Sequence, residues 1–156
     1  MQRRDFFKKL GCAAAVTAVI PMMSFAADAK KPAGPNEFSY EKALDIITGG
    51  KGAKASSIVS LKAPAIAENG AVVPITVEVE SPMTKSDYVK TIHIFATKNN
   101  NARCASVHLT QANGKAMFAA RIKLGSTQDV VALVEMSNGS FLTAKQSVKV
   151  TIGGCG

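Results

Sequence analysis

Cysteine is the residue type best suited to covalent chemistry in this 156-residue sequence, and one of its three cysteines is the penultimate residue. The last apolar run ends at Ile152 and is followed by Gly153-Gly154-Cys155-Gly156. Because glycine samples backbone conformations freely, we predict that residues 153–156 form a flexible arm. Four extended residues reach about 13 Å, at roughly 3.3–3.6 Å each. Such an arm would present an open thiol to clefts on other proteins.

The reactive form of this thiol is the thiolate, which attacks sulfur centres. No neighbouring residue favours the thiolate of Cys155, and the nearby terminal carboxylate disfavours it. We therefore expect partner enzymes to supply the activation. Cys155 is predicted to carry a substrate covalently, with Gly153, Gly154 and Gly156 as its arm. No catalytic residue is predicted, and the chain is expected not to be an enzyme.

Two other uses of the cysteines remain open. Cys155 could form an intermolecular disulfide in a secreted structural or interaction β-sandwich. It could also pair with Cys104, if their Cα atoms come within about 7 Å. A copper site built from His93, His108 and Cys104 or Met117 is a third possibility. We favour ordinary strand roles for both histidines, so no metal and no cofactor are predicted. The sequence has no CxxC, HExxH, GxSxG or Gly-rich phosphate loop.

The elements that must position Cys155 follow from hydrophobic periodicity. Ser39 can cap a helix in which Tyr40, Leu44 and Ile47 share one face, and Gly49-Gly50 can end it. From Ser57 onward apolar residues alternate with polar ones, and turn signals such as Asn-Gly separate the runs. We predict a mostly β protein: an immunoglobulin-like β-sandwich of about seven strands with one short N-terminal helix. The expected strands lie near residues 58–61, 73–79, 88–96, 105–109, 116–122, 130–136 and 148–152.

The first 26 residues are predicted to be a twin-arginine signal peptide, because Arg3-Arg4-Asp5-Phe6-Phe7-Lys8 precedes a moderately apolar stretch and small residues that suit cleavage. An ordinary Sec signal is the alternative. The signal predicts a periplasmic location. Residues 27–37 form a polar, flexible leader, residues 38–152 the β-sandwich domain and residues 153–156 the arm. The apolar stretch is too short to span a bilayer, so no membrane association is expected after cleavage.

Charge excludes one class of partner. The formal net charge is +8, and part of it belongs to the predicted signal peptide. No basic run is interleaved with aromatic residues and no groove-reading motif is present, so no nucleic-acid binding is expected. The mild basic bias of the remainder could attract small anions or an acidic partner surface.

Several segments resemble the SoxY family, the sulfur carriers of the Sox thiosulfate-oxidation system. They include the twin-arginine signal and the tail, whose cysteine matches the family's carrier cysteine in a terminal GGCGG. That cysteine maps onto Cys155. This chain ends in GGCG, one glycine short, and Cys104 is an additional thiol. The other similar segments are residues 40–50 (YEKALDIITGG), 66–96, 127–141 (TQDVVALVEMSNGSF) and 148–156 (VKVTIGGCG).

The resemblance implies an immunoglobulin-like fold and a heterodimer with a SoxZ-like subunit exported together with this chain. It implies that a haem-containing enzyme conjugates thiosulfate to the cysteine and that a hydrolase then releases sulfate. In some organisms a sulfane dehydrogenase oxidises the remaining sulfur. The carrier itself, as a swinging arm, catalyses none of these steps.

Overall fold

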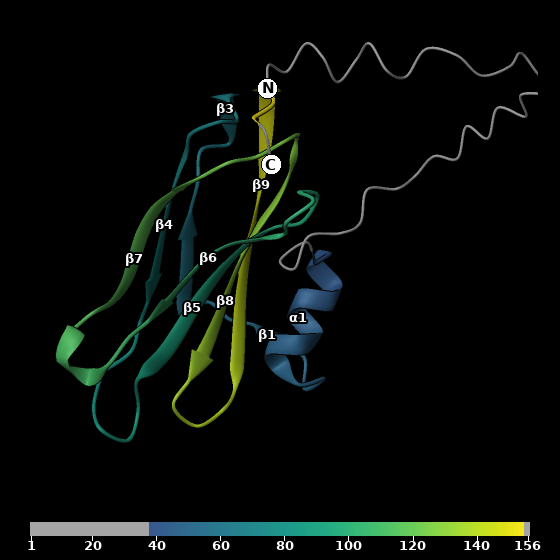
Figure 1. Ribbon diagram of the computed structural model, residues 1–156. Coiled ribbons are helices and arrows are strands. Elements are labelled where there is room, and N and C mark those ends of the chain that lie inside the picture. The colour runs from purple at the N-terminus through teal and green to yellow at the C-terminus, as the bar shows by residue number, and fades with distance from the viewer. Residues whose placement is uncertain (1–37, 155–156) are drawn as a thin grey trace, which may run out of the picture. The chain divides into compact units, whose positions relative to one another are not determined.

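The computed structural model describes residues 38–154, which form an immunoglobulin-like β-sandwich of nine strands in two sheets with one short helix (Figure 1). The elements are α1 (Tyr40–Thr48), β1 (Lys54–Ala55), β2 (Val59–Lys62), β3 (Ile66–Asn69), β4 (Val73–Val79), β5 (Val89–Ala96), β6 (Arg103–His108), β7 (Ala116–Ile122), β8 (Gln128–Met136) and β9 (Phe141–Ile152). The predicted signal peptide and leader lie outside the described residues.

Helix α1 forms where the sequence predicts it. The Ser39 hydroxyl accepts a hydrogen bond from the Lys42 amide over 3.4 Å, and Gly49 ends the helix in the left-handed conformation. The apolar face packs against the outer face of the larger sheet, where Phe95 and Leu133 are buried. Tyr40 contacts Phe95 edge to face, with ring centroids 5.6 Å apart. The predicted amphipathic helix is therefore confirmed.

The larger sheet has the strand order β1-β9-β8-β5-β6, with β3 also paired to β9. Strand β8 lies between β9 and β5, and both pairings are antiparallel. This central place accounts for its nearly continuous apolar sequence, because both of its faces are covered. The smaller sheet has the order β2-β4-β7. Alternate residues of β4, from Val73 to Val79, point into the core between the sheets.

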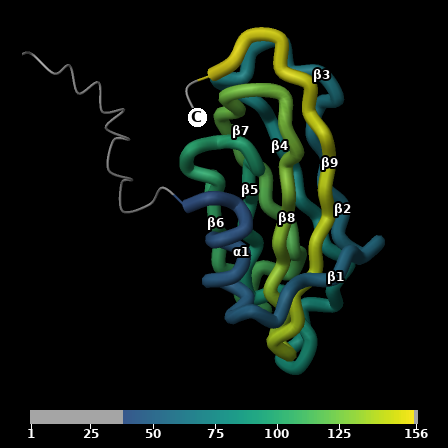
Figure 2. Tube along the Cα trace, turned by 90° about the vertical axis from the view of Figure 1, so that its right-hand side faces the viewer, coloured from purple at the N-terminus to yellow at the C-terminus, as the bar shows by residue number. Residues whose placement is uncertain are grey.

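Strand β9 differs from the prediction, because it begins at Phe141 rather than near residue 148. Its first part pairs in parallel with β1, and its last part pairs in parallel with β3. Figure 2 shows β3 beside one end of β9 and β1 beside the other. The sequence does not predict β1 and β3, so the sandwich has nine strands instead of about seven. Strand β1 has only two residues, and the Ile-Ala-Glu-Asn sequence of β3 does not alternate apolar with polar residues, so periodicity identifies neither.

The described residues contain no helix that is both long and apolar enough to cross a membrane.

Candidate functional site

The chain leading to Cys155 is held at one end of the sandwich by a series of backbone hydrogen bonds. The Gly70 amide donates to the Ile152 carbonyl over 2.7 Å, and the Leu124 amide donates to the Gly70 carbonyl over 2.7 Å. The Gly154 amide then donates to the Leu124 carbonyl over 2.9 Å. Three segments distant in sequence therefore meet at the point where the predicted carrier arm begins. They are the β3–β4 turn, the β7–β8 connection and the end of β9.

The glycines at this meeting point allow the backbones to approach closely. A Cβ added at Gly70 would lie 2.2 Å from the Leu124 carbonyl oxygen, and one at Gly154 would lie 2.6 Å from the Ala71 backbone. A Cβ at Gly153 would lie 2.3 Å from the Gly125 carbonyl oxygen. Real Cβ atoms do not approach backbone so closely, so each glycine is required for packing. We call Gly70, Leu124, Gly125, Gly153 and Gly154 the arm base.

The arm base changes the interpretation of the predicted arm. The sequence predicts a flexible arm from Gly153 onward, whereas the structure holds Gly154 against Leu124 and Ala71. The reason is that a glycine pair permits close packing as readily as it permits mobility. Cys155 and Gly156 lie outside the described residues, so the covalent role of Cys155 and the flexibility of these last two residues stay predictions.

The side chains of Asn99 and Gln128 fix the arm base, and the sequence alone predicts a functional role for neither. The Asn99 side chain donates to the Lys123 carbonyl over 2.8 Å and accepts from the Gly125 amide over 3.0 Å. It also accepts from the amide of Gln128, a side chain that is buried, over 2.8 Å. The run Asn99-Asn100-Asn101 indicates a turn in the sequence, but only the fold places it against the β7–β8 connection.

Cys104 lies on β6, half-buried, between two cavities. Burial raises the pKa of its thiol from 9.0 to about 11. The thiol is therefore protonated at neutral pH, and a protonated thiol is a poor nucleophile. Cys104 is thus unsuited to carry sulfur intermediates itself. Its suggested disulfide with Cys155 involves a residue outside the described range and stays a prediction.

The two histidines bind hydroxyl groups of neighbouring strands. His93 Nδ1 hydrogen-bonds to the Ser106 hydroxyl over 2.7 Å, and His108 Nδ1 hydrogen-bonds to the Thr91 hydroxyl over 3.0 Å. Burial lowers the pKa of His93 to about 4, with a further contribution from the Arg103 charge. Within residues 38–154, no group of three His, Cys, Asp or Glu side chains is arranged to hold a metal ion. The structure therefore gives no support to a copper site made of His93, His108 and Cys104.

Comparison with known proteins identifies a family. The family model for "Sulfur oxidation protein SoxY" matches residues 45–155, a range that ends on Cys155. The solved structure of the sulfur carrier protein SoxY from Chlorobium limicola f thiosulfatophilum is 30% identical. That match has a TM-score of 0.59 and covers 69% of this chain and 88% of that chain. No curated protein matches the sequence.

Two superoxide reductases share the fold at low identity. The superoxide reductase (neelaredoxin) from Ignicoccus hospitalis is 14% identical with a TM-score of 0.53, covering 59% of this chain and 79% of that chain. The superoxide reductase from Nanoarchaeum equitans is 11% identical with a TM-score of 0.51, covering 61% of this chain and 98% of that chain. At these identities the likeness concerns the sandwich alone and not its chemistry.

Proposed function

Because the chain belongs to the SoxY family, we propose that it is a sulfur carrier that holds thiosulfate-derived intermediates covalently on Cys155. The observation that carries this proposal is the position of Cys155, which directly follows the docked Gly154 and closes the range that matches the family model. In this proposal the sandwich is a rigid base, and Cys155 forms the covalent bond to the sulfur intermediates.

Loading the cysteine with thiosulfate is an oxidation. The Cys155 S–H bond is lost and a bond forms between its sulfur and the outer sulfur of thiosulfate, giving a cysteine S-thiosulfonate. Two electrons pass to the haem-containing partner enzyme and one proton passes to water. Hydrolysis of the terminal S–S bond then releases sulfate and leaves a persulfide on Cys155. In this scheme the partners supply the catalysis, and this chain presents the sulfur.

The division of labour is consistent with the electrostatics of the other thiol. Cys104 is kept protonated by burial, which raises its pKa to about 11, so it does not compete with Cys155 as a nucleophile. Activation of Cys155 is assigned to the partner enzymes because no neighbouring residue in the sequence favours its thiolate. We therefore propose that the chain is a carrier and not an enzyme.

The wider setting is proposed from the family resemblance. The carrier works in the periplasm after export by its twin-arginine signal, as a heterodimer with a SoxZ-like subunit. Its other partners are the haem-containing conjugating enzyme, the sulfate-releasing hydrolase and, where present, a sulfane dehydrogenase.

The test is the intact mass of the exported protein from cells oxidising thiosulfate, measured with and without reductant and followed by mapping of the C-terminal peptide. A set of sulfur and thiosulfonate adducts on Cys155 that reductant removes is expected. A clean thiol, or only a disulfide between two chains or between Cys104 and Cys155, would contradict the carrier function. The disulfide-linked dimer would instead favour a secreted structural sandwich.

A further inference from the structure

Four exposed cationic side chains lie together on the side of the sandwich where the edge strands β6 and β7 approach each other. They are those of Lys98, Arg103, Arg121 and Lys123, and we call them the basic patch. The last three line one open hollow of about 270 Å³, whose lining includes no carboxylate. None of the four takes part in an ion pair of residues 38–154, where the pairs are Lys62–Glu78, Lys90–Glu135 and Lys145–Asp129. The basic patch is therefore a surface of uncompensated positive charge.

The basic patch flanks the arm base. Lys123 precedes Leu124, whose carbonyl accepts the hydrogen bond from the Gly154 amide over 2.9 Å. Lys98 precedes Asn99, whose side chain binds the Lys123 carbonyl over 2.8 Å and also lines the hollow. The cations are thus attached to the same connections that hold the chain before Cys155.

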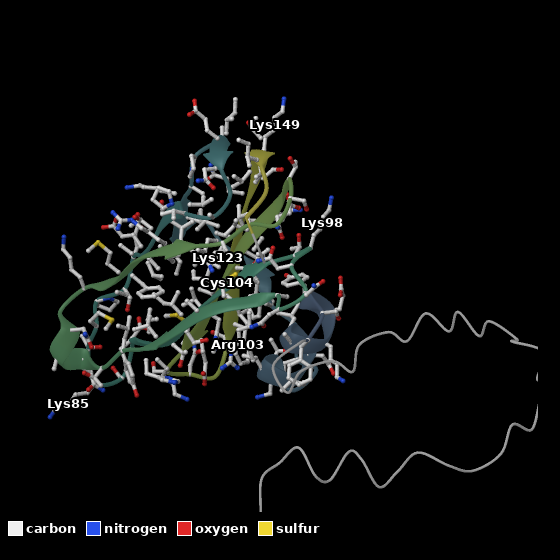
Figure 3. All side chains as sticks on the ribbon, turned by 45° about the horizontal axis from the view of Figure 1, so that its top comes forward. Lys85, Lys98, Arg103, Cys104, Lys123 and Lys149 are labelled. Atoms are coloured by element: carbon white, nitrogen blue, oxygen red, sulfur yellow. The ribbon has the colours of Figure 1, made fainter. Side chains whose placement is uncertain are left out.

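Elsewhere on the described domain the charges offset one another. On the other side of the arm base, Lys149 on β9 lies beside β3, which carries the acidic residue Glu68. At the opposite end of the sandwich both signs are mixed, with Glu78, Glu80, Lys85, Asp87 and Lys115. Figure 3 shows Lys98 and Lys149 near the end of β9 and Lys85 at the opposite end. The net positive charge is therefore concentrated beside the arm.

Any enzyme that acts on Cys155 must come close to this surface. Consecutive Cα atoms are about 3.8 Å apart, so Cys155 lies one residue beyond the docked Gly154. Even if residues 153–156 were fully extended, they would reach only about 13 Å, at roughly 3.3–3.6 Å each. The rim of the enzyme's active-site entrance therefore faces the end of the sandwich whenever Cys155 is inside.

The chemistry of the basic patch fits carboxylates on such a rim. Guanidinium groups present a planar fork of donors that matches the two oxygens of a carboxylate, and lysine adds point charges. Because the four cations come from β6, β7 and two connections, they form a broad surface and not a single pocket. Such a surface suits several acidic side chains spread over a partner protein.

We propose that the basic patch is a docking surface for acidic residues around the active-site entrance of the enzyme that loads Cys155, an inference that rests on the carrier function proposed above. Charges of opposite sign on two proteins speed their encounter and orient it. Because the other end of the domain carries mixed charge, the attraction turns the arm end toward the enzyme. The sandwich thus contributes the orientation of the encounter, and Cys155 contributes the covalent bond.

The test measures conjugation of thiosulfate by the haem-containing enzyme at varied concentrations of the carrier, which is purified together with its SoxZ-like subunit. A one-electron acceptor is present in excess, and intact mass follows the adduct. Lys98→Gln, Arg103→Gln, Arg121→Gln and Lys123→Gln are each expected to lower kcat/KM for the carrier by about two- to fivefold, the effect of one exposed charge contact. The value of kcat at saturating carrier should stay unchanged, because the substitutions affect the encounter and not the chemistry.

Lys85→Gln and Lys115→Gln are the matched controls, since both remove an exposed lysine far from the arm base. Both should keep the wild-type kcat/KM. Equal kcat/KM for the patch variants and the controls would overturn the proposal, as would a loss confined to kcat.

Salt provides a check that needs no substitution. The kcat/KM of the wild-type carrier should fall as salt rises, because the Debye length is only about 10 Å at 0.1 M. A variant lacking all four cations should show a kcat/KM lower by about tenfold or more at low salt and a flatter salt dependence. A wild-type kcat/KM that does not change with salt would contradict electrostatic docking.

Cross-linking locates the contact directly. A carbodiimide joins a lysine amine to a touching carboxylate as an amide, and the carbodiimide takes up the lost oxygen as a urea. With the Cys155→Ser carrier, which cannot be loaded, Lys98 and Lys123 are expected to form links to acidic residues of the enzyme, whereas Lys85 is not. Links from Lys85 without links from Lys98 or Lys123 would overturn the proposal.

Failure of the docking surface is distinct from failure of the carrier function. If the wild-type carrier is conjugated normally but the patch variants behave like the controls, the docking surface alone is disproved. If the wild-type carrier is not conjugated at any concentration, the carrier function fails and this inference fails with it.

Discussion

The backbone amide of Gly154 donates a hydrogen bond to the carbonyl oxygen of Leu124 over 2.9 Å, which fixes the chain one residue before Cys155. Leu124 is fully buried and belongs to the β7–β8 connection, more than twenty residues away in sequence. The start of the arm is therefore a built part of the sandwich. It fixes the position of Gly154, the residue that precedes Cys155.

Cys104 and Cys155 are expected to differ completely in function. Cys155→Ser should abolish sulfur carriage in a reconstituted thiosulfate-oxidation assay, because the only nucleophile of the arm is lost. Cys104→Ser should leave carriage largely intact, because the Cys104 thiol is protonated and half-buried. The reverse pattern would overturn the assignment of Cys155.

Gly70→Ala should lower the free energy of unfolding by about 1–3 kcal/mol, the usual cost of forcing extra atoms into a packed site. The added Cβ would lie 2.2 Å from the Leu124 carbonyl oxygen, and backbone cannot move aside as a side chain can. Urea unfolding measures the change. Gly49→Asn is the control, since Gly49 has open space around it and a left-handed conformation that asparagine tolerates. If both variants are equally stable, the close packing at Gly70 does not contribute to the free energy of unfolding.

Gly154→Ala is expected to release the start of the arm without unfolding the domain. Its Cβ would lie 2.6 Å from the backbone of Ala71, so the hydrogen bond to Leu124 cannot keep its geometry. Amide hydrogen exchange at residue 154 should become faster in the variant. The Gly70 amide, which donates to Ile152, serves as the internal control and should stay protected. Unchanged exchange at residue 154 would show that the arm base tolerates a side chain at this position.

The lowered pKa of His93 leads us to expect that the stability of the fold depends on pH. This pKa is lowered from 6.5 to about 4 in the folded protein, mainly by burial. At a pH between these two values, His93 is protonated in the unfolded chain but neutral in the folded protein. The free energy of unfolding is therefore highest above pH 6.5 and falls as the pH drops toward 4. The loss between pH 7.5 and pH 5 should be on the order of 2 kcal/mol, from 1.36 kcal/mol per pKa unit.

The measurement for His93 is urea unfolding at both pH values for the wild-type protein and His93→Gln. The glutamine can keep a hydrogen bond to Ser106 but cannot titrate, so its pH dependence should be weaker. An identical dependence in both proteins would show that other groups, such as carboxylates, cause the loss.

Cys104 should react slowly with thiol reagents. In a Cys155→Ser protein its alkylation rate at pH 8 should be about a hundredfold below that of a thiol with an ordinary pKa, since each pKa unit changes the thiolate fraction tenfold. The rate should rise with pH until the thiol titrates near pH 11. A rate that levels off near pH 9 would show that burial does not control this thiol.

Much of the fold could be predicted because apolar residues recur at the spacing of the buried face of a helix or strand. The alternation of β4, the apolar run of β8 and the capped face of α1 each record which side of the element is covered. The short strands β1 and β3 leave no such record. Each exists because β9 offers it a parallel partner, and pairing of this kind depends on neighbours that no local pattern encodes.

By itself, the sequence determined the type of chemistry: a cysteine among glycines beyond the last apolar strand, on a β-rich domain with one capped helix. These are local properties of residue type and spacing. Only the tertiary structure decided that Gly153 and Gly154 are packed rather than free and that Gly70, Asn99 and Leu124 hold them. It alone brought Arg103, Arg121 and Lys123 to one cavity beside the arm base. Such neighbours come from different strands and connections, and their proximity arises only when the two sheets close on a common core.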